Sequence, residues 1–163
     1  MGTLFGIGYD SHRLVEGESL IVGGVPIAHE LGLSGHSDAD VLAHAVIDAL
    51  LGAAGMGDIG QRFPDSDARW AGADSIRLLE TVVGELRGSG FQPVNVDCTI
   101  VMERPKLGAN RTAIRARLAA ALGLPEERVN VKATTGEGVG FVGREEGVAA
   151  MAVAGLRVAE PER

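Results

Sequence analysis

The sequence predicts an α/β or α+β fold in which helices pack against one β-sheet. Strand-like and helix-like segments alternate along the chain, and no internal repeat is present. The length of 163 residues suits one domain, so we expect a single domain over residues 1–163. With 45% hydrophobic and 23% charged residues, the composition is not that of a disordered chain.

The first half of the chain reads as a strand, a hairpin and a helix. "FGIGYDSH" (5–12) is typical of a strand, and "SLIVGGVPI" (19–27) indicates two short strands that turn at two consecutive glycines. A loop is expected at 31–38. From Ala39 to about Ala54 the apolar residues leave a separate polar stripe, which predicts a helix.

The second half alternates helices and strands. The expected elements are, in order, a helix at 73–90, a strand at 93–102, a helix at 108–123 and a strand at 128–135. The last segment, 147–158, is rich in alanine and fits either a strand or a helix. Periodicity leaves this choice open.

Composition excludes several classes of protein. The net charge of −7 argues against a nucleic-acid or membrane-surface binder, because such proteins neutralise phosphates with basic patches. No apolar stretch approaches the roughly 18–20 residues of a membrane span, and no signal peptide is visible. The single cysteine, Cys98, lies in an apolar alternation and is expected to be buried in a reducing compartment. We therefore expect a cytoplasmic protein.

A group of carboxylates and imidazoles predicts a metal site. Asp10 and His12 stand two residues apart in a strand, so they point to the same side. Asp40, His44 and Asp48 are spaced by four residues on one helix face. His44 can complete a set of three ligands with an open fourth position, and its acidic neighbours can orient the imidazole. The alternative is a solvated helix face with Asp10 capping a turn.

Three further stretches carry polar residues with two possible interpretations each. "GHSDAD" (35–40) either contacts a phosphate through His36 or serves to cap the helix with Ser37 and Asp38. "GDIGQRFPDSD" (57–67) is either a hydroxyl-binding segment or a plain polar connection. "MERPKLG" (102–108) follows a strand and offers a lysine that either binds phosphate or is merely solvated.

The stretch "VKATTGEGVGFVGREEG" (131–147) contains five glycines beside charged residues. Glycine is found where the chain turns at positive φ or where a ligand approaches the backbone closely. The segment is therefore either a loose surface loop or a phosphate cradle, and composition does not separate the two.

Taken in order, these stretches resemble one family, the 2-C-methyl-D-erythritol 2,4-cyclodiphosphate synthases of the non-mevalonate isoprenoid pathway. The resemblance runs from "GIGYDSHRLVEG" through "GHSDADVLAHAVIDALLGAAGMGDIGQRFPDSD" and "ERPKL" to "VKATTGEGVGFVGREEG". It implies a mixed β-sheet flanked by helices on one side and a homotrimer with active sites at subunit interfaces. The usual third threonine of the last motif is Gly136 here.

The resemblance also implies roles for individual residues. The zinc ligands fall on Asp10, His12 and His44, Glu137 matches the ligand of Mg²⁺ or Mn²⁺, and His36 with Thr135 matches the pair that stabilises the transition state. The remaining substrate-binding positions are Ser11, Ser37, Asp58, Ile59, Gly60, Phe63, Pro64, Asp65, Ser66, Asp67, Phe141 and Arg144. The nucleotide-binding positions are Met102, Glu103, Arg104, Pro105, Lys106, Leu107, Gly108, Ala133 and Thr134.

The implied reaction is intramolecular. The 2-phosphate of 4-diphosphocytidyl-2-C-methyl-D-erythritol 2-phosphate attacks the β-phosphorus and expels CMP, with Zn²⁺ or another divalent transition metal and a second divalent cation neutralising charge. Two alternatives belong to other classes: a zinc-dependent phosphoesterase that gives a linear product, and an inactive cytidine-nucleotide-binding module.

Overall fold

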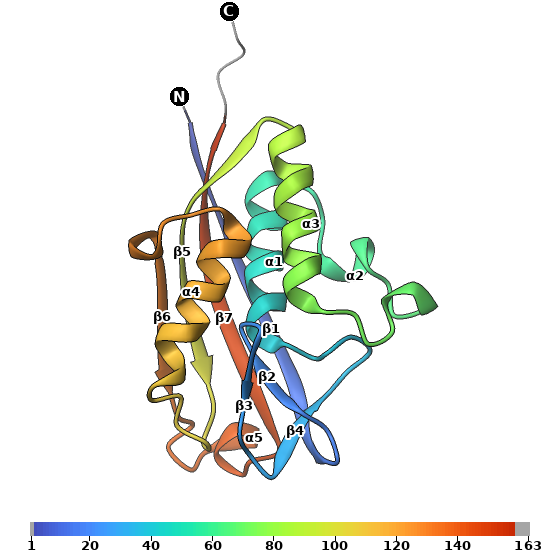
Figure 1. Cartoon of the computed structure of the whole chain (residues 1–163), viewed down its shortest axis with the longest axis vertical. Helices are drawn as coiled ribbons and strands as arrows, with labels where there is room; N and C mark the ends of the chain where they lie inside the picture. The colour runs from blue at the N-terminus through green and yellow to red at the C-terminus, as the bar shows by residue number, and fades with distance from the viewer. Residues whose placement is uncertain (1, 159–163) are drawn as a thin grey trace, which may run out of the picture.

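The computed structural model describes residues 2–158, so residues 1 and 159–163 of the expected domain lie outside the described part. Five strands form a mixed sheet in the order β4-β1-β7-β5-β6 (Figure 1). Their bounds are β1 Thr3–Glu16, β4 Leu31–Ser34, β5 Phe91–Val101, β6 Val129–Thr134 and β7 Gly147–Val158. Only the β5–β6 pair is parallel, and the other three pairs are antiparallel.

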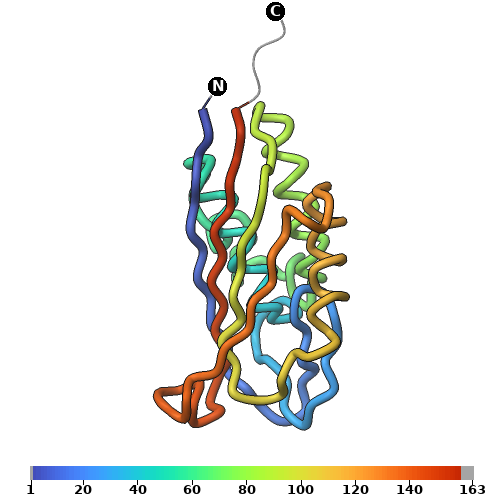
Figure 2. The backbone as a smooth tube through the Cα atoms, turned by 90° about the vertical axis from the view of Figure 1, so that its left-hand side faces the viewer, coloured from blue at the N-terminus to red at the C-terminus, as the bar shows by residue number. Residues whose placement is uncertain are grey.

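Helices cover one face of this sheet, as Figures 1 and 2 show. The three long helices are α1 Val41–Ala54, α3 Ser75–Gly88 and α4 Asn110–Leu122, and a hairpin of β2 Leu20–Val22 and β3 Val25–Ile27 lies beside them. The short elements are α2 Ile59–Arg62, η1 Ala68–Trp70, η2 Glu126–Arg128 and α5 Gly140–Gly143. Between residues 2 and 158, no helix combines the length and the apolar character needed to cross a membrane.

The predicted order of strands and helices is confirmed, and the open choice at 147–158 is resolved as a strand. This segment lies between β1 and β5 and pairs antiparallel with both, so its alanines fill a central strand. One expectation was wrong: the loop predicted at 31–38 contains β4, because Leu31–Ser34 pairs with the end of β1. That pairing joins distant segments, and local sequence patterns do not report it.

Cys98 is buried, as predicted. Burial raises the pKa of its thiol to about 12, so the thiolate that acts as a nucleophile is essentially absent near neutral pH. This side chain packs in the core and is not a candidate for catalysis.

Helix α1 lies unusually close to β1 because two glycines face it. A Cβ atom at Gly8 would lie 1.9 Å from the carbonyl oxygen of Ala45, and one at Gly6 would lie 2.0 Å from that of Ala49. Both neighbours are backbone atoms of α1, which cannot move aside. Because alternate strand residues share a face, the residues that follow these glycines on the same side of β1 also point at α1.

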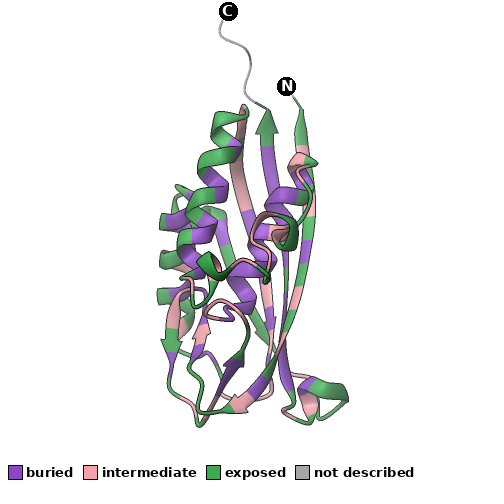
Figure 3. Ribbon diagram, turned by 90° about the vertical axis from the view of Figure 1, so that its right-hand side faces the viewer, coloured by how far each residue is buried: buried purple, intermediate pink, exposed green. Residues whose placement is uncertain are grey.

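The other face of the sheet carries exposed apolar side chains. Phe5, Ile7 and Tyr9 of β1 are 70%, 72% and 55% exposed, and Met151 and Val153 of the adjacent β7 are also exposed. Figure 3 shows how exposed and buried positions alternate along the strands. A contiguous apolar face of this kind is typical of an interaction surface.

We expect Gly8→Ala to lower the free energy of unfolding by about 3 kcal/mol, because the added methyl group overlaps immovable backbone. Gly84, in the exposed part of α3, has open space at its Cβ position. As the matched control, Gly84→Ala should instead raise stability by about 0.5–1 kcal/mol. Urea unfolding at a fixed chain concentration measures both, and equal effects of the two changes would contradict the close packing of α1 on β1.

Candidate active site

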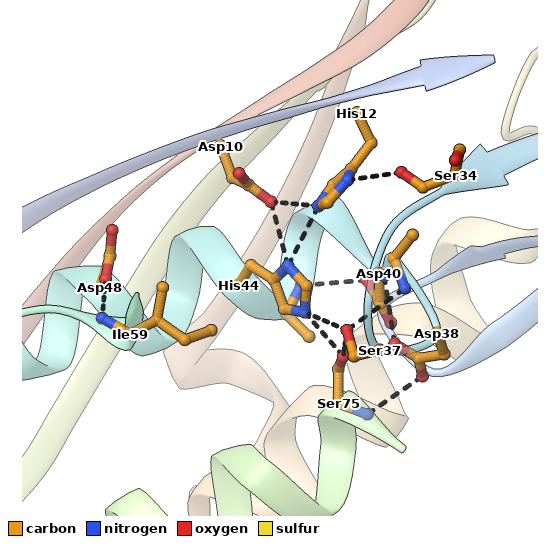
Figure 4. Close-up of polar contacts among 12 residues, drawn as sticks. Asp10, His12, Ser34, Ser37, Asp38, Asp40, His44, Asp48, Ile59 and Ser75 are labelled. Carbon is orange, nitrogen blue, oxygen red and sulfur yellow. Dashed lines mark hydrogen bonds and ion pairs between the residues drawn. The ribbon is translucent and has the colours of Figure 1, made fainter. Parts of the chain in front are cut away.

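Three predicted ligand residues converge where β1 faces the first turns of α1 (Figure 4). Asp10 Oδ2 lies 2.8 Å from His12 Nε2 and 3.1 Å from His44 Nδ1. The two imidazole nitrogens are 3.2 Å apart, and the three ligand atoms all lie within 4.8 Å of one another. Two imidazoles and one carboxylate with this convergence form the donor set of an open divalent metal site.

The outer ring nitrogens of both histidines are held by other groups. His12 Nδ1 lies 2.9 Å from the backbone carbonyl of Ser34, which only accepts, so this nitrogen carries the proton. His44 Nε2 lies 2.8 Å from the Ser75 hydroxyl, which in turn donates to the Asp38 carboxylate and therefore accepts from His44. Each imidazole thus keeps an unprotonated nitrogen that points to the place where the three ligand atoms converge, as metal-binding histidines require.

Asp10 is suited to the same role by its charge. Burial raises the pKa of its carboxyl, but the hydrogen bonds with His12 and His44, and the positive charges that these rings carry when protonated, outweigh that effect and hold its pKa at about 2. Near neutral pH Asp10 is therefore ionised and can only accept. The donor atoms and their protonation states all fit a divalent metal ion.

The expectation that Asp40 and Asp48 orient His44 was wrong. Asp40 is completely buried and caps α1, accepting hydrogen bonds from Ala43 N at 3.0 Å and from the backbone of Gly23 at 2.8 Å and Gly24 at 2.6 Å. Asp48 accepts from the backbone N–H of Ile59 at 2.7 Å. The solvated helix face proposed as an alternative is equally wrong, because α1 is packed on nearly all sides.

The orienting carboxylate is instead Asp38, which reaches His44 through Ser75. Asp38 also accepts from Ser75 N at 3.0 Å and so ties the start of α3 to the loop before α1. Capping of the helix by Asp38 was one of two interpretations of this stretch, and Asp40 is the cap instead. Neither this role of Asp38 nor Ser75 as a partner of His44 follows from local sequence, because 37 positions separate the two residues.

A cavity of about 370 Å³ opens beside the three ligands. Its predicted lining residues are Asp10, His12, His36, Ser37, His44, Ile59, Gly60, Phe63 and Asp65. Trp70 and Leu78 also line it and were missed by the sequence analysis. The ring of Trp70 stands edge-on to that of Phe63, with centroids 4.9 Å apart, so the two form one aromatic wall. The one sequence signal that could have identified Trp70 as a lining residue was its position shortly after "FPDSD", as the only tryptophan of the chain.

A second cavity, of about 440 Å³, lies between the ends of β5 and β6 and the start of α4. Its predicted members are Met102, Pro105, Lys106, Leu107, Gly108, Ala133, Thr134, Thr135 and Glu137. Ile100 and Arg111 complete the lining and were not foreseen. Hydroxyls and cations beside apolar side chains suit a ligand with both an anionic and a flat apolar part.

The glycines of 131–147 are explained partly by the expected positive φ angles and partly by close contacts within the loop. A Cβ at Gly136 would lie 2.8 Å from Gly143 N, and one at Gly143 would lie 2.2 Å from the carbonyl carbon of Gly138. Gly138 and Gly140 adopt positive φ values of 71° and 70°. The loop is thus folded tightly on itself.

Several predicted residues lie outside both cavities. Ser11, between two ligands on β1, points to the open face of the sheet. Asp58 caps α2 by accepting from Gln61 N at 2.9 Å, and Arg144 pairs with Glu146. The full set of predicted residues that line neither cavity is Ser11, Asp58, Pro64, Ser66, Asp67, Glu103, Arg104, Phe141 and Arg144.

The two cavities lie toward opposite edges of the molecule. The first adjoins α2, and the second adjoins α4 and β6, which stand on opposite sides in Figure 1. Within residues 2–158, their lining sets share no residue.

Known proteins resemble this chain over nearly its full length. The model of the YgbB family matches residues 3–157. The 2-C-methyl-D-erythritol 2,4-cyclodiphosphate synthase of Salinibacter ruber is 58% identical over 154 residues, which cover 94% of this chain and 98% of that protein. The synthase of Symbiobacterium thermophilum is 60% identical over 151 residues, covering 93% and 96%. A solved structure of such a synthase in a CDP-bound form has a TM-score of 0.86 at 38% identity and covers 94% of this chain and 99% of that one.

We expect Ser75→Ala to weaken the binding of Zn²⁺ by about 10- to 100-fold, because His44 Nε2 loses its nearer hydroxyl partner, Ser75 Oγ at 2.8 Å, and keeps only Ser37 Oγ at 3.1 Å. Asp48→Asn is the matched control, since Asp48 contacts the backbone of Ile59 and not the imidazole. Competition with a chromophoric chelator measures both affinities. A loss in the control as large as that in Ser75→Ala would contradict the assignment.

Proposed function

Because the chain belongs to the YgbB family, we propose that it converts 4-diphosphocytidyl-2-C-methyl-D-erythritol 2-phosphate to 2-C-methyl-D-erythritol 2,4-cyclodiphosphate with release of CMP. Its named relatives are synthases of that product, and the chain is accordingly a cyclising lyase of isoprenoid biosynthesis. The observation that carries the proposal is the convergence of Asp10, His12 and His44 in a chain that also has a separate pocket suited to a nucleotide.

The reaction requires positioning more than proton transfer. An oxygen of the 2-phosphate forms a bond to the β-phosphorus, and the bond from that phosphorus to the bridging oxygen of CMP breaks. A phosphate monoester has its second pKa near about 6, so the attacking oxygen is already ionised near neutral pH. The protein has to bring attacking and leaving oxygens into line and offset the charge.

The first cavity would hold the methylerythritol phosphates. A Zn²⁺ ion or another divalent transition metal on Asp10, His12 and His44 would supply positive charge to a phosphate oxygen. His36 and Ser37 line the same cavity and offer hydrogen-bond donors beside it.

The polyol would lie against Ile59, Gly60, Phe63 and Asp65, with Trp70 completing the wall. Ser11, Asp58, Pro64, Ser66, Asp67, Phe141 and Arg144 remain proposed substrate contacts, although they lie outside the cavity of a single chain.

The second cavity would hold the cytidine diphosphate part. Lys106 and the hydroxyls of Thr134 and Thr135 line it and can donate to phosphate oxygens. Thr135 and His36 would act together on the charge that develops during transfer. The backbone of 102–108 with Ala133 would frame the base, and Glu137 would bind Mg²⁺ or Mn²⁺ together with the diphosphate, as Mg²⁺ sites with phosphate ligands do.

Two features support a homotrimer with active sites at subunit interfaces. The open sheet face exposes Phe5, Ile7 and Tyr9, which association would bury. The two cavities lie toward opposite edges of one chain, so that the second cavity of one copy can complete the first cavity of its neighbour. We place the whole chain, residues 1–163, in one such synthase domain, working in the cytoplasm with a small-molecule substrate.

Phosphorus NMR of the protein with the proposed substrate, Zn²⁺ and Mg²⁺ tests the activity. We expect a cyclic diphosphate and one equivalent of CMP, both lost on addition of EDTA. His44→Ala should also lose both, because one of three ligands is gone. Linear phosphate products would indicate a phosphoesterase instead, and CMP binding without turnover would indicate a nucleotide-binding module.

Light scattering after size-exclusion chromatography tests the assembly. The native chain should elute at the mass of three copies, and Ile7→Asp should elute as a monomer because it places a charge on the apolar face. Ala120→Asp adds the same charge on the exposed side of α4 and should leave the trimer intact. A monomeric native chain, or an unchanged mass for Ile7→Asp, would rule out this interface.

A further inference from the structure

Glu103 was expected among the nucleotide-binding residues, but its side chain points to the glycine-rich loop. Its Oε2 atom accepts a hydrogen bond from Gly136 N at 2.8 Å, and its Oε1 atom accepts from Gly138 N at 3.2 Å. The two bonds join the end of β5 to a segment 33 to 35 residues further along the chain. One carboxylate therefore holds the backbone on both sides of Glu137.

Glu137 itself adopts a conformation that needs support. Its φ is +53°, in the left-handed region that residues other than glycine rarely occupy. Its backbone N–H donates to Thr135 Oγ1 at 3.1 Å. Such a conformation persists only where surrounding contacts fix it. The two hydrogen bonds that Glu103 accepts fix Gly136 and Gly138, the residues on either side of Glu137. They thereby determine where the side chains of Glu137 and Thr135 enter the second cavity.

Arg104, the residue after Glu103, holds the other end of the glycine-rich loop. Arg104 donates to both carboxylate oxygens of Glu145, from Nε at 2.8 Å and from Nη2 at 2.7 Å. Consecutive side chains at the end of β5 therefore anchor the segment from 136 to 145 at both ends. Arg104 is exposed, whereas Glu103 is half-buried and holds the two residues that flank Glu137, which lines the cavity.

The carboxylates of Glu103 and Glu137 have different roles. The Gly136 and Gly138 N–H groups donate to Glu103, so they are not available to a phosphate. In the described part of the chain, the Glu137 carboxylate forms neither a hydrogen bond nor an ion pair, and it lines the cavity. A carboxylate left free beside a diphosphate suits a Mg²⁺ ion, which takes one or two protein carboxylates together with phosphate oxygens.

We propose that Glu103 is a positioning residue that fixes the Gly136–Gly138 backbone and so places the Glu137 carboxylate to bind a divalent cation together with a nucleoside diphosphate. The proposal rests on the proposed function for the presence of that ligand. It gives Glu103 no contact with the nucleotide.

The test uses Glu103→Gln in the full-length protein with CDP as the probe. Glutamine keeps one accepting oxygen, but its amide NH₂ group faces the second backbone N–H, donor against donor. We expect the Mg²⁺-dependent gain in CDP affinity, measured by calorimetry, to fall about tenfold or more, as for other groups that orient a cation ligand. CDP affinity without Mg²⁺ should change less than about twofold, and amide exchange at 136–138 should speed up about tenfold.

Glu127→Gln is the matched control, because Glu127 is exposed in η2, at the opposite end of β6 from the loop. It should match the native protein in all three measurements. An equal loss of CDP affinity with and without Mg²⁺ would mean that Glu103 contacts the nucleotide, and faster exchange with an unchanged Mg²⁺ effect would mean a purely structural role. Either result overturns the proposal.

Failure of the proposed function gives a different result. If the native protein shows no Mg²⁺ effect on CDP binding, the cation role of Glu137 fails together with this proposal. If that effect is present and only the cyclic product is missing, the proposed reaction fails while the role of Glu103 stands, because the titration needs no turnover.

Discussion

The close contact of α1 with β1 is the constraint on which the candidate site depends. Because Gly6 and Gly8 have no side chains, the backbone of the helix lies directly on the strand. The same side of β1 then continues with Asp10 and His12, and His44 faces them from the first turn of α1. Larger residues at the two glycines would hold the helix away from the strand and separate the imidazole from its partners. The metal site is thus a result of how two elements pack, as well as of which ligands they carry.

Several carboxylates in this acidic protein join separate elements of the fold. Asp40 joins the β2–β3 hairpin to the start of α1, Asp38 joins α3 to the loop before α1, and Glu103 joins β5 to the glycine-rich loop. In each case backbone N–H groups surround the negative charge, which lowers its cost in a partly buried place. These three carboxylates therefore hold elements of the fold together, and their oxygens are already engaged by backbone donors.

Sequence analysis predicted the order of the elements and the three ligands, because strand and helix periodicities determine which residues share a face. It could not predict β4, whose pairing with β1 depends on tertiary structure, nor the link from His44 through Ser75 to Asp38. The roles assigned to Asp40 and Asp48 were wrong for a related reason. Helical spacing gives the side of the helix on which a residue lies but not the partner it meets there.

The glycine-rich loop shows that a sequence motif can have two origins at once. Its glycines at 136 and 143 are required by contact of the loop with itself, whereas the ligand cavity beside it is lined by Thr134, Thr135 and Glu137. Natural variation at these two glycines should therefore reflect the folding of the loop more than the identity of the ligand. Among related chains, differences in chemistry are better sought at positions 134 and 135, which line the cavity and precede the tightly folded turn.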